Sequence, residues 1–180
     1  MSIDFKITPS KIIEGIKIIE PSISTDRRGN IWTSFLKDEI DTLLPSNLVF
    51  KHDKFSESKY NVLRGIHGDH KSWKLVTCVF GEILQVVVDC REDSPTYLKY
   101  EKFLINKDNQ QLILIPPGLG NSYYVKSEHA VYHYKLAYEG EYIDADEQFT
   151  LSWDDNKVNI DWGDITPILS DRDMKALRSN

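Results

Sequence analysis

The sequence has little cysteine, no long apolar run, and no repeated or low-complexity segment. Two cysteines in 180 residues, Cys78 and Cys90, are too few for a four-thiolate metal site, and we expect reduced thiols. No run is long enough for a transmembrane helix, and segment 1–15 lacks the layout of a signal peptide. The formal charge of −6 argues against non-specific nucleic-acid binding. We therefore expect a cytoplasmic protein with no membrane or nucleic-acid partner, whose residues 1–180 form one domain.

Helical periodicity is also scarce, and short β-like runs separated by turn residues fill most of the chain. The pattern predicts an all-β, mostly antiparallel sandwich or barrel with short helices over 36–45 and 170–179 at its edges. Runs 74–80 and 82–90 flank Gly81 like the arms of a hairpin. The apolar run 86–88 indicates a strand buried on both faces. The predicted strands are 31–35, 74–80, 82–90, 100–105, 111–116, 121–125, 130–138 and 148–153.

The segment NVLRGIHGDHKSWKLV (61–76) carries an Arg, two His, an Asp and two Lys within a β-like pattern. A metal site needs three or four converging ligands, whereas His67 and His70 supply two at a spacing of three. Metal-binding cupin barrels usually offer His-x-His, then Glu and a later His, and here Asn121 stands where that late His would be useful. We therefore expect no metal site, and we read His70 as an exposed loop residue.

His67 has a different setting from His70. Strand alternation places Leu63, Gly65 and His67 on one face, so that His67 faces the interior if Leu63 does. An interior His is most often a hydrogen-bonded core residue, but an interior His with an orienting carboxylate is a general base. The spacing leaves both readings open.

Tyrosines crowd the later predicted strands. A packed aromatic layer, a stacking platform for a base, and a cavity-facing hydroxyl that donates a proton all fit this pattern. The tyrosines are Tyr123, Tyr124, Tyr132, Tyr134, Tyr138 and Tyr142.

The segment SDRD (170–173) has the composition of an ordinary charged surface helix.

A series of motifs runs in order through nearly the whole chain: DRRG (26–29), NVLRGIH (61–67), KLV (74–76), GEILQVVVDCREDSPT (81–96), IPPGLGN (115–121), YK (134–135), WDD (153–155), IDW (160–162) and LSDRD (169–173). Together they resemble the dTDP-4-dehydrorhamnose 3,5-epimerase family. The resemblance is closer to one branch, the GDP-4-keto-heptose epimerases of bacterial capsular polysaccharide synthesis, as in Campylobacter. It implies a cupin-like jelly roll with a few short peripheral helices.

The resemblance implies an isomerase that inverts carbons 3 and 5 of a nucleotide-linked 4-keto sugar by removing and returning a proton beside the ketone, with no cofactor. It implies that His67 is the base and that Asp173 is the carboxylate paired with it. Tyr134 would donate a proton from the other face of the sugar. Lys74 and Arg64 would lie near the sugar, where they stabilise the enolate oxygen.

The resemblance also implies a homodimer with exchanged N-terminal strands, so that Arg27 or Arg28 contacts the diphosphate in the neighbouring site. Two departures from the rhamnose enzymes bear on the ligand. Asn121 replaces an active-site His, and it donates a hydrogen bond but exchanges no proton at neutral pH. HDK, from His52 to Lys54, stands where those enzymes read QDN near the nucleotide. We therefore expect these side chains to contact the substrate, and we expect a GDP-linked 4-keto-heptose.

The rhamnose enzymes carry a second tyrosine shortly after the proton donor, which we link to the choice of carbons. Here YKLAYEGEY (134–142) offers Tyr138 or Tyr142, or an empty position at Gly140. We assign Tyr138 to substrate binding, while its role relative to Tyr142 stays open. The alternatives are inversion at carbon 3 alone, on the same or a related nucleotide sugar, a non-catalytic sugar-nucleotide-binding cupin, and a metal cupin.

Overall fold

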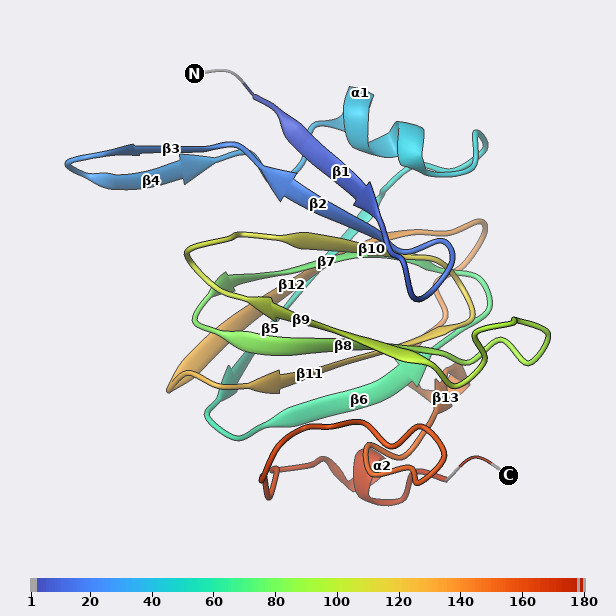
Figure 1. Ribbon diagram of the computed structural model, residues 1–180. Coiled ribbons are helices and arrows are strands. Elements are labelled where there is room, and N and C mark those ends of the chain that lie inside the picture. Colours follow the sequence, from blue (N-terminus) through green and yellow to red (C-terminus); the bar gives the residue numbers. More distant parts are fainter. Residues whose placement is uncertain (1–2, 178, 180) are drawn as a thin grey trace.

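The computed structural model describes residues 3–177 and 179, and two antiparallel sheets face each other in it (Figure 1). The six-stranded sheet has the order β1 (Phe5–Pro9), β2 (Lys17–Pro21), β10 (Leu112–Ile115), β7 (Trp73–Phe80), β12 (His129–Ala137) and β5 (His52–Lys59). The five-stranded sheet has the order β13 (Phe149–Thr150), β6 (Leu63–Gly68), β11 (Leu119–Val125), β8 (Ile83–Asp89) and β9 (Tyr100–Ile105). A hairpin of β3 (Ile23–Asp26) and β4 (Gly29–Trp32) projects beyond both sheets. The predicted all-β jelly roll is confirmed.

Strand alternation divides the apolar side chains between the interior and the outer faces of the sheets. On β8, Val87 packs in the interior, whereas Val86 and Val88 pack against the C-terminal segment with Trp162. All three valines are fully buried, which confirms the prediction for run 86–88. The outer face of the six-stranded sheet is covered in the same way by the segment around Ile40.

The predicted hairpin of 74–80 and 82–90 is wrong. β7 pairs with β10 and β12 in one sheet, whereas β8 pairs with β9 and β11 in the other. Gly81 does form a tight turn, with φ of +86° and its Cβ position only 2.2 Å from the carbonyl oxygen of His129. A glycine between two apolar runs predicts a turn whether the two strands pair with each other or join different sheets. Which strands pair is decided by contacts between segments far apart in the sequence.

The helices are shorter than predicted. α1 (Lys37–Ile40) continues as a 3₁₀ turn over Asp41–Leu43 and stops before Pro45. α2 (Asp171–Met174) is capped by Ser170, but Leu177 forms a β-bridge with Leu151 and draws the chain back to the sheet. Residue 178 of the predicted helix lies outside the described residues. Nowhere in residues 3–177 is there a helix long and apolar enough to cross a membrane.

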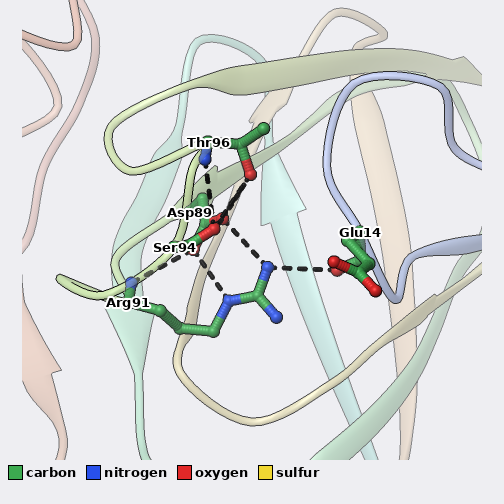
Figure 2. A network of polar contacts seen from close by, with 5 residues as sticks. All are labelled: Glu14, Asp89, Arg91, Ser94 and Thr96. Carbon is green, nitrogen blue, oxygen red and sulfur yellow. Dashed lines mark hydrogen bonds and ion pairs between the residues drawn. The ribbon is translucent and has the colours of Figure 1, made fainter.

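A polar network around Asp89 fixes the end of β8 (Figure 2). The guanidinium of Arg91 donates to both carboxylate oxygens at 2.9 Å, and the hydroxyls of Ser94 and Thr96 each donate to Oδ2 at 2.6 Å. Arg91 also donates to the carbonyl oxygen of Glu14 at 3.0 Å, which ties this loop to the turn between β1 and β2. Burial raises the pKa of Asp89, but these donors outweigh it and lower the pKa to about 2.

Candidate functional site

A cavity of about 480 Å³ lies between the two sheets. Its walls come from β5, β7 and β12 of one sheet and β6 and β11 of the other, and segments 142–148 and 168–173 form its rim. A cavity of this size suits a small-molecule ligand. The predicted site residues that line it are Lys54, Arg64, His67, Lys74, Asn121, Tyr134 and Asp173. The predicted site residues that do not line it are Arg27, Arg28, His52 and Tyr138.

His67, at the end of β6, pairs with Asp173 of α2. Its Nε2 lies 2.5 Å from Asp173 Oδ1, and the side chains are 25% and 2% exposed. Burial raises the pKa of Asp173, but the hydrogen bond and charge of His67, with Ser170 and the Gly65 backbone, hold it below its usual value. The ionised carboxylate keeps the proton on Nε2, so Nδ1 is the nitrogen that can accept another. The reading of 170–173 as a plain surface helix is therefore wrong for Asp173.

Arg64 and His67 lie on the same wall of the cavity. His67 pairs with Asn121 and Arg64 pairs with Tyr123, so β6 spans three residues where β11 spans two. This β-bulge turns both side chains inward, while Leu63 packs in the outer cluster. His67 faces the interior as predicted, but the argument that it shares a face with Leu63 is wrong, because strict alternation assumes a regular strand.

Tyr134 lines the cavity from β12, in the sheet that faces β6. Tyr132 also lines the cavity from β12, and the two ring centroids lie 5.8 Å apart. Burial raises the pKa of Tyr134, and the positive charges of Lys54 and Arg64 partly oppose that rise. A phenol that holds its proton at neutral pH thus stands on the wall facing His67.

Lys74 is an almost fully buried cation in the cavity wall, 7% exposed. Its Nζ lies 3.5 Å from Oδ2 of Asp69, which is also buried. Asp69 Oδ1 accepts the backbone N–H groups of Lys71 and Ser72 at 2.9 and 2.5 Å, which fixes the turn between β6 and β7. Burial lowers the pKa of Lys74, and the charge of Asp69 offsets only part of this. Sequence reasoning did not select Asp69, whose contact with Lys74 appears only in the folded chain.

Asn121 belongs to a closed network with two side chains that sequence reasoning did not select. Gln85 Nε2 donates to Asn121 Oδ1 at 2.6 Å, and the Tyr132 hydroxyl donates to Gln85 Oε1 at 2.9 Å. Asn121 Nδ2 lies 3.2 Å from the same hydroxyl. A polar Gln in the apolar run of β8 was the available signal, because a buried amide needs partners.

Of the two tyrosines that follow Tyr134 in the chain, Tyr142 rather than Tyr138 lines the cavity. Lys54 Nζ donates to the Tyr142 hydroxyl at 2.9 Å. The Tyr138 hydroxyl lies 3.2 Å from Nδ1 of His52, and neither residue lines the cavity. The substrate-contact predictions for these two residues are therefore not supported. β12 ends at Ala137, so the chain leaves the strand before Tyr138 and returns over the rim at Tyr142.

Arg27 and Arg28 form the turn of the β3–β4 hairpin, and neither lines the cavity. The hairpin projects beyond both sheets (Figure 1). Arg28 is exposed and pairs with Asp26 at 2.6 Å. The chain therefore does not bring these arginines to its own cavity, and their contact with a neighbouring site stays a prediction.

Arg172 is a cation that lines the cavity. Sequence analysis did not select it, because segment 170–173 has the composition of a surface helix. Its Nε donates to Thr150 Oγ1 at 2.8 Å, which holds α2 against β13.

His70 lies outside the cavity, with its ring 5.4 Å from that of Phe149. Within the described part of the chain, no three His, Cys, Asp or Glu side chains are grouped so that they could hold a metal ion.

Comparison with known proteins identifies similar chains over most of the length. The family model described as dTDP-4-dehydrorhamnose 3,5-epimerase matches residues 10–179. The dTDP-4-dehydrorhamnose 3,5-epimerase of Salmonella typhimurium is 32% identical over 168 residues, which are 91% of this chain and 90% of that protein.

Two solved structures are also similar. The dTDP-6-deoxy-D-glucose-3,5-epimerase of Legionella pneumophila, in complex with dTDP-4-keto-L-rhamnose, has a TM-score of 0.86 and 33% identity, covering 96% of this chain and 92% of that chain. A 3'-monoepimerase of Streptomyces bikiniensis, in complex with dTDP-quinovose, has a TM-score of 0.84 and 28% identity, covering 94% and 86%. The chain thus shares its fold with an enzyme named for two carbons and with one named for a single carbon.

Proposed function

Because the chain belongs to the dTDP-4-dehydrorhamnose 3,5-epimerase family, we propose that it inverts the configuration of a nucleotide-linked 4-keto sugar. The predicted enzyme class, an isomerase, is that of the family. One observation carries the proposal: His67 and Tyr134 stand in facing sheets of one cavity, and a buried Asp173 is paired with the histidine. Deprotonation and reprotonation from opposite faces of a sugar need this arrangement.

The chemistry follows from the ketone at carbon 4, which acidifies the hydrogens on the neighbouring carbons. Nδ1 of His67 takes the proton, and Asp173 stabilises the imidazolium that forms. The electron pair of the broken C–H bond moves into an enolate, whose oxygen Lys74 stabilises. Tyr134 then donates a proton to the other face of the same carbon. Since a proton leaves and a proton returns, the carbon undergoes no net oxidation and the reaction calls for no redox cofactor.

The polar side chains around this pair fit the rest of the ligand. We assign Arg64, Asn121 and Lys54 to substrate contact, because all three line the cavity. Asn121 is held by Gln85 and Tyr132, so its amide presents one geometry to the sugar.

Two substitutions test the acid–base assignment. His67→Asn and Tyr134→Phe each remove one proton-transfer group, and each is expected to lower kcat by about 10²-fold or more. The measurement is epimerisation of a nucleotide 4-keto sugar in deuterium oxide, with label followed by NMR. Unchanged epimerisation in both variants would refute the assignment, whereas a wild-type chain that binds the nucleotide sugar without epimerising it would be a non-catalytic sugar-nucleotide-binding protein.

We further propose inversion at both carbon 3 and carbon 5. Besides Tyr123, Tyr132 and Tyr134 of the walls, the cavity has a phenol at its rim, Tyr142, and the family is named for the double reaction. A relative named as a 3'-monoepimerase supports the alternative, inversion at carbon 3 alone. Deuterium at both carbons of the product supports the first reading, and label confined to carbon 3 supports the second.

We propose a GDP-linked 4-keto-heptose as substrate, on the closer resemblance to the heptose branch and on Lys54, which lines the cavity from the HDK segment at 52–54. The relatives compared above are named for dTDP-linked sugars, so a dTDP-linked 4-keto-6-deoxyhexose is the competing substrate. Comparing kcat/KM for the two ligands decides between them. Preference for the dTDP sugar would reject the heptose branch and leave the proposed reaction intact.

We also propose a homodimer in which the β3–β4 hairpin brings Arg27 or Arg28 to the diphosphate of the neighbouring site, and a cytoplasmic role in capsular heptose synthesis. The projection of the hairpin from the sheets supports the first point. Replacing both arginines with alanine is expected to raise KM while sedimentation still shows a dimer. A monomeric wild-type chain with full activity would refute the shared site.

A further inference from the structure

Lys54 lies between two cavity tyrosines that come from different segments. It is the register partner of Tyr134 on the neighbouring strand β12. Its Nζ lies 6.0 Å from the centroid of the Tyr134 ring and 4.5 Å from that of Tyr142. The same ammonium donates a hydrogen bond to the Tyr142 hydroxyl at 2.9 Å. One cation therefore joins a strand of the cavity wall to the rim segment 142–148.

The hydrogen bond from Lys54 determines which groups the hydroxyl proton of Tyr142 can reach. An ammonium group has three donors and no acceptor, so the Tyr142 oxygen must accept. The O–H of Tyr142 is then left to donate elsewhere, and Tyr142 lines the cavity. Lys54 thus presents Tyr142 to a ligand as a hydrogen-bond donor.

Lys54 also acts on Tyr134 through its charge. A tyrosine that gives up a proton becomes a phenolate, and a cation about 6 Å away stabilises that anion. Burial raises the pKa of Tyr134, and Lys54 opposes this rise. The other charged or titratable groups that face these side chains in the cavity are Arg64, His67, Lys74, Tyr123, Tyr132, Asp144, Arg172 and Asp173. Outside the cavity, the rings of His52 and Tyr138 pack against Tyr142.

We propose that Lys54 is a positioning residue that couples the two tyrosines, holding Tyr142 as a donor to the sugar and stabilising the phenolate of Tyr134. In the step concerned, the O–H bond of Tyr134 breaks, a C–H bond forms at the enolate carbon, and the O–H electron pair stays on the phenolate oxygen. The role rests on the proposed function and extends it, because substrate contact alone would not link Lys54 to the acidity of Tyr134.

The test compares Lys54→Met with Lys54→Arg, which keeps the charge and the donors, and with Lys51→Met. Lys51 is a matched control, because its ammonium lies 4.2 Å from the ring centroid of Tyr138 outside the cavity. Carbon-13 NMR of ring-labelled tyrosine, assigned with Tyr134→Phe, measures the pKa of Tyr134 without any substrate. Lys54→Met is expected to raise that pKa by about one pH unit and to lower kcat about tenfold.

Lys54→Arg is expected to restore both values, and Lys51→Met to leave both unchanged. An unchanged pKa of Tyr134 in Lys54→Met overturns the proposal, and so does an unchanged kcat. If the wild-type chain epimerises no 4-keto sugar, the proposed function fails, and the pKa measurement alone decides whether Lys54 controls Tyr134. If arginine restores both the pKa of Tyr134 and kcat, the effect of Lys54→Met comes from the lost charge and donors and not from a general loss of folding.

Discussion

Asp69 and Lys74 form a buried ion pair across the turn between β6 and β7, with Oδ2 and Nζ 3.5 Å apart. Burial alone would favour a neutral amine at Lys74, and the carboxylate opposes this. The charge that the proposed mechanism places beside the enolate oxygen therefore depends on Asp69, a residue that has its other oxygen committed to two backbone N–H groups.

Asp69→Asn tests that dependence. Without the carboxylate the pKa of Lys74 falls further, so Lys74 loses its proton at a lower pH. The alkaline limb of the kcat profile is expected to move to lower pH by about one unit. Ser72→Ala, in the same turn, is the control, because its buried hydroxyl has no hydrogen-bond partner among the described residues. A profile identical to that of the wild type in Asp69→Asn would contradict the role.

Asp173→Asn tests the carboxylate partner of His67. An amide that donates to Nε2 leaves the neutral ring with its proton on Nδ1, the nitrogen that has to accept one. We expect kcat to fall by about 10²-fold or more with little change in KM. Asp171→Asn is the control, since Asp171 is exposed on the same helix. Steady-state kinetics decide, and near-normal turnover in Asp173→Asn would remove this residue from the mechanism.

Asp89 is expected to make stability depend on pH. Its pKa lies at about 2 in the folded chain, against 3.8 for an unperturbed aspartate. A depressed pKa stabilises the fold above pH 3.8, and that contribution, about 2 kcal/mol, is lost as the pH falls toward 2. Urea unfolding at pH 6 and near pH 2 should therefore show the gap between wild type and Asp89→Asn narrowing in acid.

Asp161→Asn is the matched control for Asp89→Asn, because Asp161 is an exposed partner of Lys102. A surface pair of this kind contributes little at either pH. A gap for Asp89→Asn that is equally wide at both pH values would show that its network acts through geometry rather than charge.

Gly65 lies between the two inward-facing residues of β6. It has φ of +122°, and a Cβ there would lie 2.5 Å from Ser122 Cβ and 2.7 Å from the carbonyl oxygen of Asn121. Gly65→Ala must push β6 away from β11, so we expect a loss of more than about 2 kcal/mol in the free energy of unfolding and a loss of activity.

Gly163→Ala separates the cost of a positive φ from the cost of steric contact between the new Cβ and β11. Gly163 also has a positive φ, +79°, but nothing lies within 4 Å of its Cβ position. Its replacement should cost only about 1 kcal/mol. Urea unfolding curves of the two variants provide the comparison, and equal losses would mean that the contact with β11 is unimportant.

Local pattern predicted most central strands because their apolar residues alternate or run together, as in 86–88. It missed β1, β2, β3 and β5, whose exposed faces carry Lys, Glu, Ser and Asp among few apolar residues. It also could not assign strand partners: Gly81 marks a turn, but the two strands beside it join different sheets. Pairing of this kind is decided by packing between segments far apart in the chain.

The site was predicted mainly by resemblance, for a physical reason. The contact of His67 with Asp173 spans 106 residues, and no local spacing encodes it. The inward turn of Arg64 depends on a bulge, which alternation does not foresee. The Asp69–Lys74 pair and the network of Gln85 required the folded chain, since each joins a buried polar group to a partner whose distance the sequence does not state.

Asp173 comes late in the sequence, and its position affects the order in which the chain acquires its parts during synthesis. Every strand of both sheets precedes residue 151, whereas the carboxylate that orients His67 follows it. During synthesis the two sheets have all their residues before the acid–base pair exists. On the proposed mechanism, turnover is therefore acquired only after the residues of both sheets have been made, and a chain clipped before residue 173 keeps its histidine without the partner that makes it a base.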